Sequence, residues 1–223
     1  MSKHTVAVMG LGVRGKIHIH GLLENPDYYE IVGLCDIKQE ALDLVSETYH
    51  LEHVPQFLDA EEMLKATRPE VFVFVTYPNL RLSMIDLAIR YGVKAVSLEK
   101  PMAESLQEAK QMVNLCHEHG IKAVVCHQQK YLSQFQRMKQ KIEEGVIGDI
   151  RKIHVETQAW FSQLGTHYVD YTLWINGGYR AKWVCGHVHG PVSLEDTHPA
   201  PDYLMGTMEL ENGVRAYIEC GYL

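Results

Sequence analysis

One stretch decides the fold of this chain: Val6-Ala7-Val8-Met9-Gly10-Leu11-Gly12-Val13-Arg14-Gly15. Its four leading apolar residues predict a short buried strand, and the three glycines then fit the pattern G-x-G-x-x-G ahead of a helix-like segment. In this pattern Gly10 allows a tight turn, Gly12 lets the backbone approach a pyrophosphate, and Gly15 lets the helix pack closely on the strand. Because N–H groups at a helix start attract anions, the stretch predicts a phosphate-binding turn.

The residues that follow strengthen this interpretation. A second apolar segment, residues 31–35, ends in Asp36, which lies 21 positions after Gly15 (36 − 15). A carboxylate at this distance is suited to accept hydrogen bonds from the ribose hydroxyls of an adenosine. The glycine pattern alone also fits an ordinary strand-to-helix turn, but strand, turn, helix, strand and acid in register favour dinucleotide binding.

Composition excludes several other classes of protein. The 223 residues carry a formal charge of −7 and show no basic stripe, so we expect no nucleic-acid partner. No apolar run is long enough to span a bilayer, so we expect no membrane partner. Because the first predicted strand begins close to the start of the sequence, we expect no signal peptide. The cysteines are scattered and form no C-x-x-C pair, which is typical of reduced thiols in a cytoplasmic protein: Cys35, Cys116, Cys126, Cys185 and Cys220.

Apolar and helical segments alternate along the first half of the chain. Strand-like segments at 71–75, 94–98 and 123–126 follow helix-like segments at 61–66, 80–91 and 105–120. Ser105 and Glu108 form a capping box for the last of these helices. This alternation predicts a parallel sheet covered on both faces, whose strand ends bring the turns after residues 75 and 98 together. We therefore predict an α/β dinucleotide-binding domain over residues 1–127.

The pattern changes beyond residue 128. Helices are predicted over 132–144 and 165–175, and strands over 150–161, 182–188, 204–210 and 214–220, with a hairpin turn at Glu211-Asn212-Gly213. This order predicts a second, α+β domain over residues 128–223 with a mixed, largely antiparallel sheet. Because the sequence stops directly after a strand, we expect a truncated chain whose sheet edge needs another strand or a partner.

Together these motifs resemble the Gfo/Idh/MocA family of glucose-fructose oxidoreductase, inositol dehydrogenase and rhizopine-catabolism proteins. The resemblance covers essentially the whole chain and depends on the glycine loop, Thr76 to Asn79, Glu99-Lys100-Pro101, Lys130-Tyr131, Gly145-Val146-Ile147-Gly148 and Gly165-x-His167-x-x-Asp170. It implies an N-terminal Rossmann domain and a C-terminal sheet domain often used for oligomerisation, hence a homo-oligomer. It also implies NAD(P)-dependent oxidation or reduction of a sugar, polyol or cyclitol.

Three residues are the candidate catalytic groups. The Lys100 ammonium, at a strand end, can hydrogen-bond a substrate hydroxyl and stabilise a developing alkoxide. His167 and Asp170 are three positions apart on one helix and share a face, with Gln163 four positions earlier on the same face. Neutral His167 can act as general base near pH 7. The alternatives are a surface lysine and a buried histidine satisfied by Asp170; the resemblance favours the catalytic roles.

The chain departs from the family pattern at two positions. Many family members carry an acid where this chain has Gln163, and many carry histidine where Leu82 stands. Glutamine cannot hold a charge or accept a proton, so a relay from an acid to His167 is altered here. Asp170 substitutes for that acid, or the substrate differs. The exact substrate therefore stays open.

The nicotinamide cofactor is predicted to be NAD, with NADP possible. Asp36 repels a 2′-phosphate, whereas Lys38 and Arg14 can pair with one. The predicted cofactor-binding residues are Gly10, Leu11, Gly12, Val13, Arg14, Gly15, Asp36, Lys38, Thr76, Tyr77, Pro78, Asn79, Glu99 and Lys100. The predicted substrate-binding residues are Lys130, Tyr131, Trp160, Gln163 and His198.

Other interpretations of the sequence remain open. His187 and His189, with Asp196, His198 and Asp202 nearby, resemble a metal site, but ligands without fixed spacing are usually coincidence, and we predict no metal. An NAD-dependent glycosidase of the same family and a non-catalytic, dinucleotide-binding regulatory subunit are the two alternative functions. A methyltransferase is disfavoured because Glu99-Lys100-Pro101 has no role in that chemistry.

Overall fold

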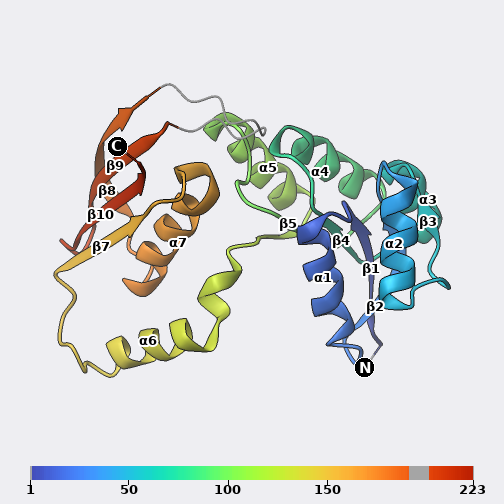
Figure 1. Ribbon diagram of the computed structural model, residues 1–223, viewed down its shortest axis with the longest axis horizontal. Helices are drawn as coiled ribbons and strands as arrows, with labels where there is room; N and C mark the ends of the chain where they lie inside the picture. Colours follow the sequence, from blue (N-terminus) through green and yellow to red (C-terminus); the bar gives the residue numbers. More distant parts are fainter. Residues whose placement is uncertain (1, 191–200, 223) are drawn as a thin grey trace. The chain divides into compact units, whose positions relative to one another are not determined.

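The computed structural model describes residues 2–190 and 201–222. The chain divides into two compact units, Met1–Cys126 and His127–Leu223. Each unit has its own sheet and its own helices (Figure 1). None of the helices in the described ranges is long and apolar enough to cross a membrane.

The first unit contains a parallel sheet of six strands. The strands are β1 (His4–Met9), β2 (Tyr29–Cys35), β3 (Gln56–Phe57), β4 (Val71–Phe74), β5 (Ala95–Leu98) and β6 (Lys122–Val125). Their order in the sheet is β3-β2-β1-β4-β5-β6, and every neighbouring pair is parallel. The predicted α/β fold with a parallel sheet is therefore confirmed. Strand β3 was not predicted, because two residues carry no periodic signal.

Helices cover both faces of this sheet. They are α1 (Val13–Leu23), α2 (Gln39–Tyr49), α3 (Ala60–Thr67), α4 (Arg81–Arg90), α5 (Leu106–Glu118) and the short 3₁₀ helix η1 (Pro78–Leu80). Val6 and Val8 of β1 pack in the apolar cluster that includes Ile19 of α1. Ala7 packs in the opposite cluster, which includes Met63 of α3 and Ile85 of α4. Because successive strand residues face opposite sides, β1 contributes to both layers.

The predicted capping box at the start of α5 is formed in part. Ser105 Oγ accepts a hydrogen bond from the Glu108 N–H at 3.1 Å, as expected for an N-cap serine. The Glu108 carboxylate accepts from the N–H of Glu104 at 3.2 Å, one residue earlier than the standard box requires. Both contacts satisfy backbone donors near the helix start.

The second unit contains a four-stranded mixed sheet. Its elements are η2 (Gln128–Tyr131), α6 (Ser133–Glu143), β7 (Lys152–Thr157), η3 (Phe161–Gly165), α7 (Thr166–Ile175), β8 (Ala181–His189), β9 (Tyr203–Leu210) and β10 (Arg215–Gly221). The order is β7-β10-β9-β8, with β7 parallel to β10 and the other pairs antiparallel. This confirms the predicted mixed, largely antiparallel sheet. The last strand, β10, lies between two others, so it is not an edge of the sheet.

The predicted strand over residues 150–161 is too long. Strand β7 ends at Thr157, where Thr157 Oγ1 accepts a hydrogen bond from the N–H of Ala159 at 3.1 Å and the chain turns. The π-helical turn η3 follows. Gly165 permits this wide turn, because a Cβ there would overlap the ring of Phe161. The alternation of apolar and polar residues continues beyond Thr157, so the sequence pattern did not indicate the turn.

Candidate active site

The glycine loop between β1 and α1 has the properties expected of a phosphate-binding turn. Gly10 has a φ of +85°, and a Cβ there would collide with the carbonyl of Val75, so glycine is required for the turn. A Cβ at Gly15 would collide with the Gly10 carbonyl, as expected where a helix packs closely on a strand. Gly12 is exposed, and a Cβ there would have no atom within 4 Å. The space in front of Gly12 therefore suits a bulky anion.

The start of α1 offers backbone donors to that space. Gly12 is the N-cap and provides no side-chain cap, so the first N–H groups of α1 lack the usual side-chain acceptor. Val13 and Arg14 are exposed beside it. A helix N-terminus with this geometry favours a phosphate group.

Asp36 lies at the end of β2 and is hydrogen-bonded to the loop. Its Oδ2 accepts from the N–H of Leu11 at 2.7 Å, and its Oδ1 accepts from the N–H of Lys38 at 3.0 Å. The side chain is half-buried, and each carboxylate oxygen has a second lone pair. Asp36 can therefore hold the glycine loop in place and still accept a ribose hydroxyl.

The turn after β4 is held by a buried arginine. Arg81, the first residue of α4, is only 2% exposed. Its Nη2 and Nε donate to the carbonyl of Thr76 at 2.7 and 3.2 Å, and its Nη2 lies 3.5 Å from the carbonyl of Lys100. Tyr77 is exposed and Pro78 is buried, so this turn presents a mixed surface next to β5.

The turn after β5 carries Glu99 and Lys100. Glu99 is 7% exposed, and its Oε1 lies 3.1 Å from Nε2 of His18, which lies in the second turn of α1. The other oxygen, Oε2, accepts from the N–H of Lys100 at 3.3 Å. Lys100 is half-buried, and the peptide bond to Pro101 is cis. The Glu99 carboxylate thus links α1 to the turn after β5 that carries Lys100.

The His18–Glu99 pair is electrostatically strong. Burial lowers the pKa of the His18 imidazole, but hydrogen bonds to Cys126 and Glu99 outweigh it and raise the pKa to about 9. Burial raises the pKa of Glu99, yet its contacts with His18 leave the net direction downward. A raised pKa for His18 and a lowered pKa for Glu99 are the shifts expected when an imidazolium pairs with a carboxylate.

His18, Glu99 and Cys126 also offer metal-ligand atoms that lie within 4.8 Å of one another. Imidazole, carboxylate and thiolate are ligand types that zinc accepts. The charge of Arg81 acts on Glu99 and Cys126, however, and opposes a second cation at this position. The cluster is better described as a hydrogen-bonded charge network.

In the second unit, the predicted catalytic histidine is buried. His167, in α7, is 1% exposed, and its Nδ1 lies 3.2 Å from the hydroxyl oxygen of Tyr171. That hydroxyl donates to Gln129 Oε1 at 3.0 Å, so its oxygen accepts from Nδ1–H of the neutral ring. The ring of His127 lies edge-on to His167 at a centroid distance of 5.0 Å. This assignment leaves the basic lone pair of neutral His167 on Nε2.

Asp170 forms an ion pair with Lys130. The Lys130 Nζ lies 2.9 Å from Oδ2 and 3.2 Å from Oδ1, and both side chains are largely covered. The structure thus satisfies His167 with Tyr171 and gives Asp170 a different partner. The Lys130 ammonium also lies 5.6 Å from the ring centre of Tyr131, which is exposed.

The other predicted substrate residues are more dispersed. Gln163 lies in η3 rather than in α7 and is exposed, whereas His167 is buried. Trp160 is half-buried directly before η3. His198 lies outside the described residues, as does Asp196, while His187 and His189 are exposed on β8.

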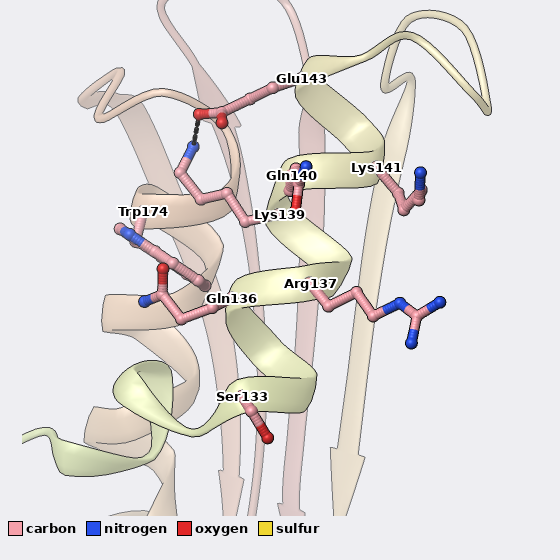
Figure 2. A pocket seen from close by; sticks show the side chains of 8 residues that line it. All are labelled: Ser133, Gln136, Arg137, Lys139, Gln140, Lys141, Glu143 and Trp174. Carbon is pink, nitrogen blue, oxygen red and sulfur yellow. Dashed lines mark ion pairs between the residues drawn. The ribbon is translucent and has the colours of Figure 1, made fainter.

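A groove of about 810 Å³ is lined by residues of α6 and by Trp174 of α7 (Figure 2). Lys139 forms an ion pair with Glu143 at 2.7 Å and lies 5.5 Å from the ring centre of Trp174. None of the predicted site residues within 2–190 and 201–222 lines this groove. We attach no catalytic role to it.

Sequence reasoning missed five residues that hold these groups in place. They are His18, Arg81, Cys126, Gln129 and Tyr171. Only two carry a usable signal in the sequence. His18 lies three positions after Gly15, and Tyr171 lies four after His167, so each shares a helix face with a predicted residue.

Two family profiles together match almost the whole chain. The profile described as an oxidoreductase family with an NAD-binding Rossmann fold matches residues 4–127, and the profile of the GFO/IDH/MocA C-terminal domain matches residues 135–223. This chain belongs to the Gfo/Idh/MocA family. The expected family and Rossmann-type fold are thereby confirmed.

Curated Gfo/Idh/MocA-like relatives include sugar dehydrogenases. The chain is 26% identical to D-apiose dehydrogenase of Paraburkholderia graminis, over 97% of this chain and 60% of that protein. It is 24% identical to D-glucoside 3-dehydrogenase of Escherichia coli, over 97% of this chain and 70% of that protein. The chain thus spans about two thirds of the length of these relatives.

Solved structures show the same fold. The WlbA dehydrogenase from Bordetella pertussis, in complex with NADH and UDP-GlcNAcA, superposes with a TM-score of 0.82 at 24% identity, over 100% of this chain and 73% of that one. Myo-inositol 2-dehydrogenase from Lactobacillus plantarum gives 0.81 at 16% identity, over 99% and 70%. At these identities the likeness concerns the fold.

Proposed function

We propose that this protein is an NAD(P)-dependent oxidoreductase that oxidises or reduces a CH–OH group of a sugar, polyol or cyclitol. The observation that carries the proposal is the exposed glycine loop at the start of α1, tied by Leu11 to Asp36. Its open space at Gly12 and its N–H donors suit a dinucleotide pyrophosphate. The sugar and inositol dehydrogenases among the relatives support the substrate class.

The first unit is proposed to bind the cofactor and to supply the cation. Residues 10–15, Asp36 and the turns after β4 and β5 are the proposed dinucleotide contacts. When bound, the nicotinamide supplies the hydride acceptor. The Lys100 ammonium donates a hydrogen bond to the reacting hydroxyl oxygen, which lowers the energy of the alkoxide that forms as hydride departs.

The second unit is proposed to supply the base. His167 takes the hydroxyl proton on Nε2, and its hydrogen bond to Tyr171 supports this tautomer. Asp170 keeps Lys130 in place rather than orienting His167 directly. Lys130, Tyr131, Trp160, Gln163 and His198 are proposed substrate contacts.

NAD is the proposed cofactor, with NADP as the alternative. The Asp36 carboxylate repels a ribose 2′-phosphate, whereas the exposed side chains of Arg14 and Lys38 carry charges that can attract one. A lower KM for NAD than for NADP supports this choice, and comparable KM values contradict it.

A homo-oligomer in a reducing compartment, such as the cytoplasm, is also proposed. Strand β8 is a sheet edge whose residues are all exposed, including Trp183, Val184 and Val188. Unpaired apolar edges of this kind favour association. None of the five cysteines, all of which lie in the described residues, forms a disulfide, which supports the reducing compartment. A monomeric mass in light scattering would contradict the oligomer.

The test is a panel of sugars, polyols and inositols with NAD or NADP, followed by the absorbance of reduced cofactor. Net accumulation of reduced cofactor supports a dehydrogenase; its absence with tightly retained NAD supports the glycosidase or regulatory alternatives. Lys100→Met is expected to abolish turnover and keep NAD affinity. Lys94→Met, an exposed lysine before the same strand, is the matched control and should retain turnover. Wild-type turnover in Lys100→Met contradicts the proposed role.

A further inference from the structure

Arg81 is the most deeply buried charged side chain in the described part of the first unit. It is 2% exposed and begins α4 directly after η1. Its guanidinium reaches two backbone carbonyls, that of Thr76 after β4 and that of Lys100 after β5. Those two strands are parallel neighbours in the sheet, so one side chain joins two adjacent turns.

This placement is costly for folding. Burial lowers the pKa of Arg81 to about 10, although Glu99 and Cys126 act in the opposite direction. The cation also lies at the start of a helix, where the helix dipole favours negative charge. In addition, Nη1 is buried with no hydrogen-bond partner in the described ranges. An apolar residue of similar size avoids all three costs.

Arg81 can, however, fix the geometry of the two turns that it contacts. A planar guanidinium has donors in fixed directions, so it can hold carbonyl groups from different segments at a set spacing. The Thr76 carbonyl accepts hydrogen bonds from both Nε and Nη2 of Arg81, which fixes the plane of the guanidinium. Glu99 Oε2 accepts a hydrogen bond from the N–H of Lys100, so the peptide groups before and after Lys100 each have a side-chain partner.

We infer that Arg81 is a positioning residue: its guanidinium joins the turn after β4 to the turn after β5 and thereby fixes the backbone from which the Lys100 ammonium projects. This inference rests on the proposed function for its consequence in turnover. The backbone consequence is independent of it. Because misplacing a catalytic group by about 1 Å can reduce rates by roughly 100-fold, a loosened turn is expected to slow turnover strongly.

The first test uses Arg81→Met and measures amide hydrogen exchange by mass spectrometry. Peptides covering residues 76–79 and 99–104 are expected to exchange at least about tenfold faster, while the peptides of β1, β2 and α2 keep their wild-type rates. Arg90→Met is the matched control, because Arg90 ends the same helix and is exposed. It should leave both turns unchanged. Unchanged exchange in Arg81→Met, or faster exchange everywhere, overturns the inference.

The second test measures turnover per NAD-binding site with the best substrate of the panel. For Arg81→Met we expect kcat to fall between about tenfold and 100-fold, and the KM for NAD to rise by a smaller factor, because the glycine loop and Asp36 still contact the dinucleotide. Wild-type kcat in this variant, with Lys100→Met inactive, overturns the positioning role alone. Wild-type kcat in Lys100→Met overturns the proposed function alone.

A conservative variant covers the case in which Arg81→Met does not fold. Arg81→Lys keeps the charge but has one compact donor group in place of the fork. We expect a Tm close to that of the wild type, faster exchange in the two turns, and a reduced kcat. Wild-type exchange and kcat in Arg81→Lys overturn the claim that the planar set of guanidinium donors is needed to hold the two turns.

Discussion

The pH dependence of stability should reveal the His18–Glu99 pair. Burial lowers the pKa of His18, but hydrogen bonds to Cys126 and Glu99 outweigh burial and raise the pKa from 6.5 to about 9, although the side chain is 20% exposed. At 1.36 kcal/mol per pKa step, this difference corresponds to at most about 3 kcal/mol of folding free energy. The contribution is present in full below pH 6.5, where the imidazole is protonated in both states.

The contribution disappears as the pH rises. Between pH 6.5 and about 9 the unfolded chain releases the His18 proton and the folded protein keeps it, so the free energy of unfolding decreases. Above pH 9 the ring is neutral in both states. We therefore expect the stability difference between wild type and His18→Gln to shrink by about 3 kcal/mol from pH 6 to pH 9.5.

The assay is urea unfolding at several pH values, followed by circular dichroism. Tryptophan fluorescence is unsuitable, because Trp160, Trp174 and Trp183 all lie in the second unit. Glu99→Gln and the double variant with His18→Gln complete a mutant cycle that isolates the pair from other titrating groups. A coupling energy independent of pH, or an NMR titration of the His18 ring with a midpoint near 6.5, would refute the reasoning.

Two further predictions concern the glycine loop of the first unit and Tyr171 of the second unit. Gly12→Ala should keep the wild-type Tm and weaken NAD binding, because its Cβ enters the open space at the loop, whereas Gly10→Ala should lower the Tm because its Cβ meets the Val75 carbonyl at a positive φ. Calorimetry of both variants checks this, and equal effects contradict it. Tyr171→Phe should shift the pH–rate profile and cost about 1 kcal/mol of stability, because it removes the oxygen that accepts from His167. An unaltered profile contradicts the assigned tautomer.

The parts of the fold that could be predicted are those set by local rules. Gly10, Gly15 and Asp36 have roles fixed by a turn, a close approach and a spacing, and the structure gives each the expected surroundings. Strand β3 and the π-helical turn η3 could not be predicted, because two residues show no periodicity and Gly165 accommodates the Phe161 ring only in three dimensions. Alternation alone gave no reason to end β7 at Thr157.

The partners of the candidate catalytic groups were harder to predict for a different reason. Lys130 and Asp170 are 40 positions apart, and His18 and Glu99 are 81 apart, so no window of sequence contains either pair. Asp170 was expected to serve His167 because helix spacing allows it, but Lys130 offers a charge and Tyr171 lies one turn from the histidine. Spacing along a helix therefore shows which residues can be partners, whereas the charges brought together by the fold decide which partners are used.

Arg81 shows why a buried charge is informative once the fold is known. On sequence alone nothing distinguishes it from the solvent-exposed arginines that are typical of protein surfaces. The structure instead surrounds it with the ends of two strands, where unpaired carbonyls need donors and where Glu99 supplies the opposite charge. A hydrophobic residue could fill that volume but could not bind the carbonyls. The position therefore requires a cation with several donors, and the turn that carries Lys100 depends on it.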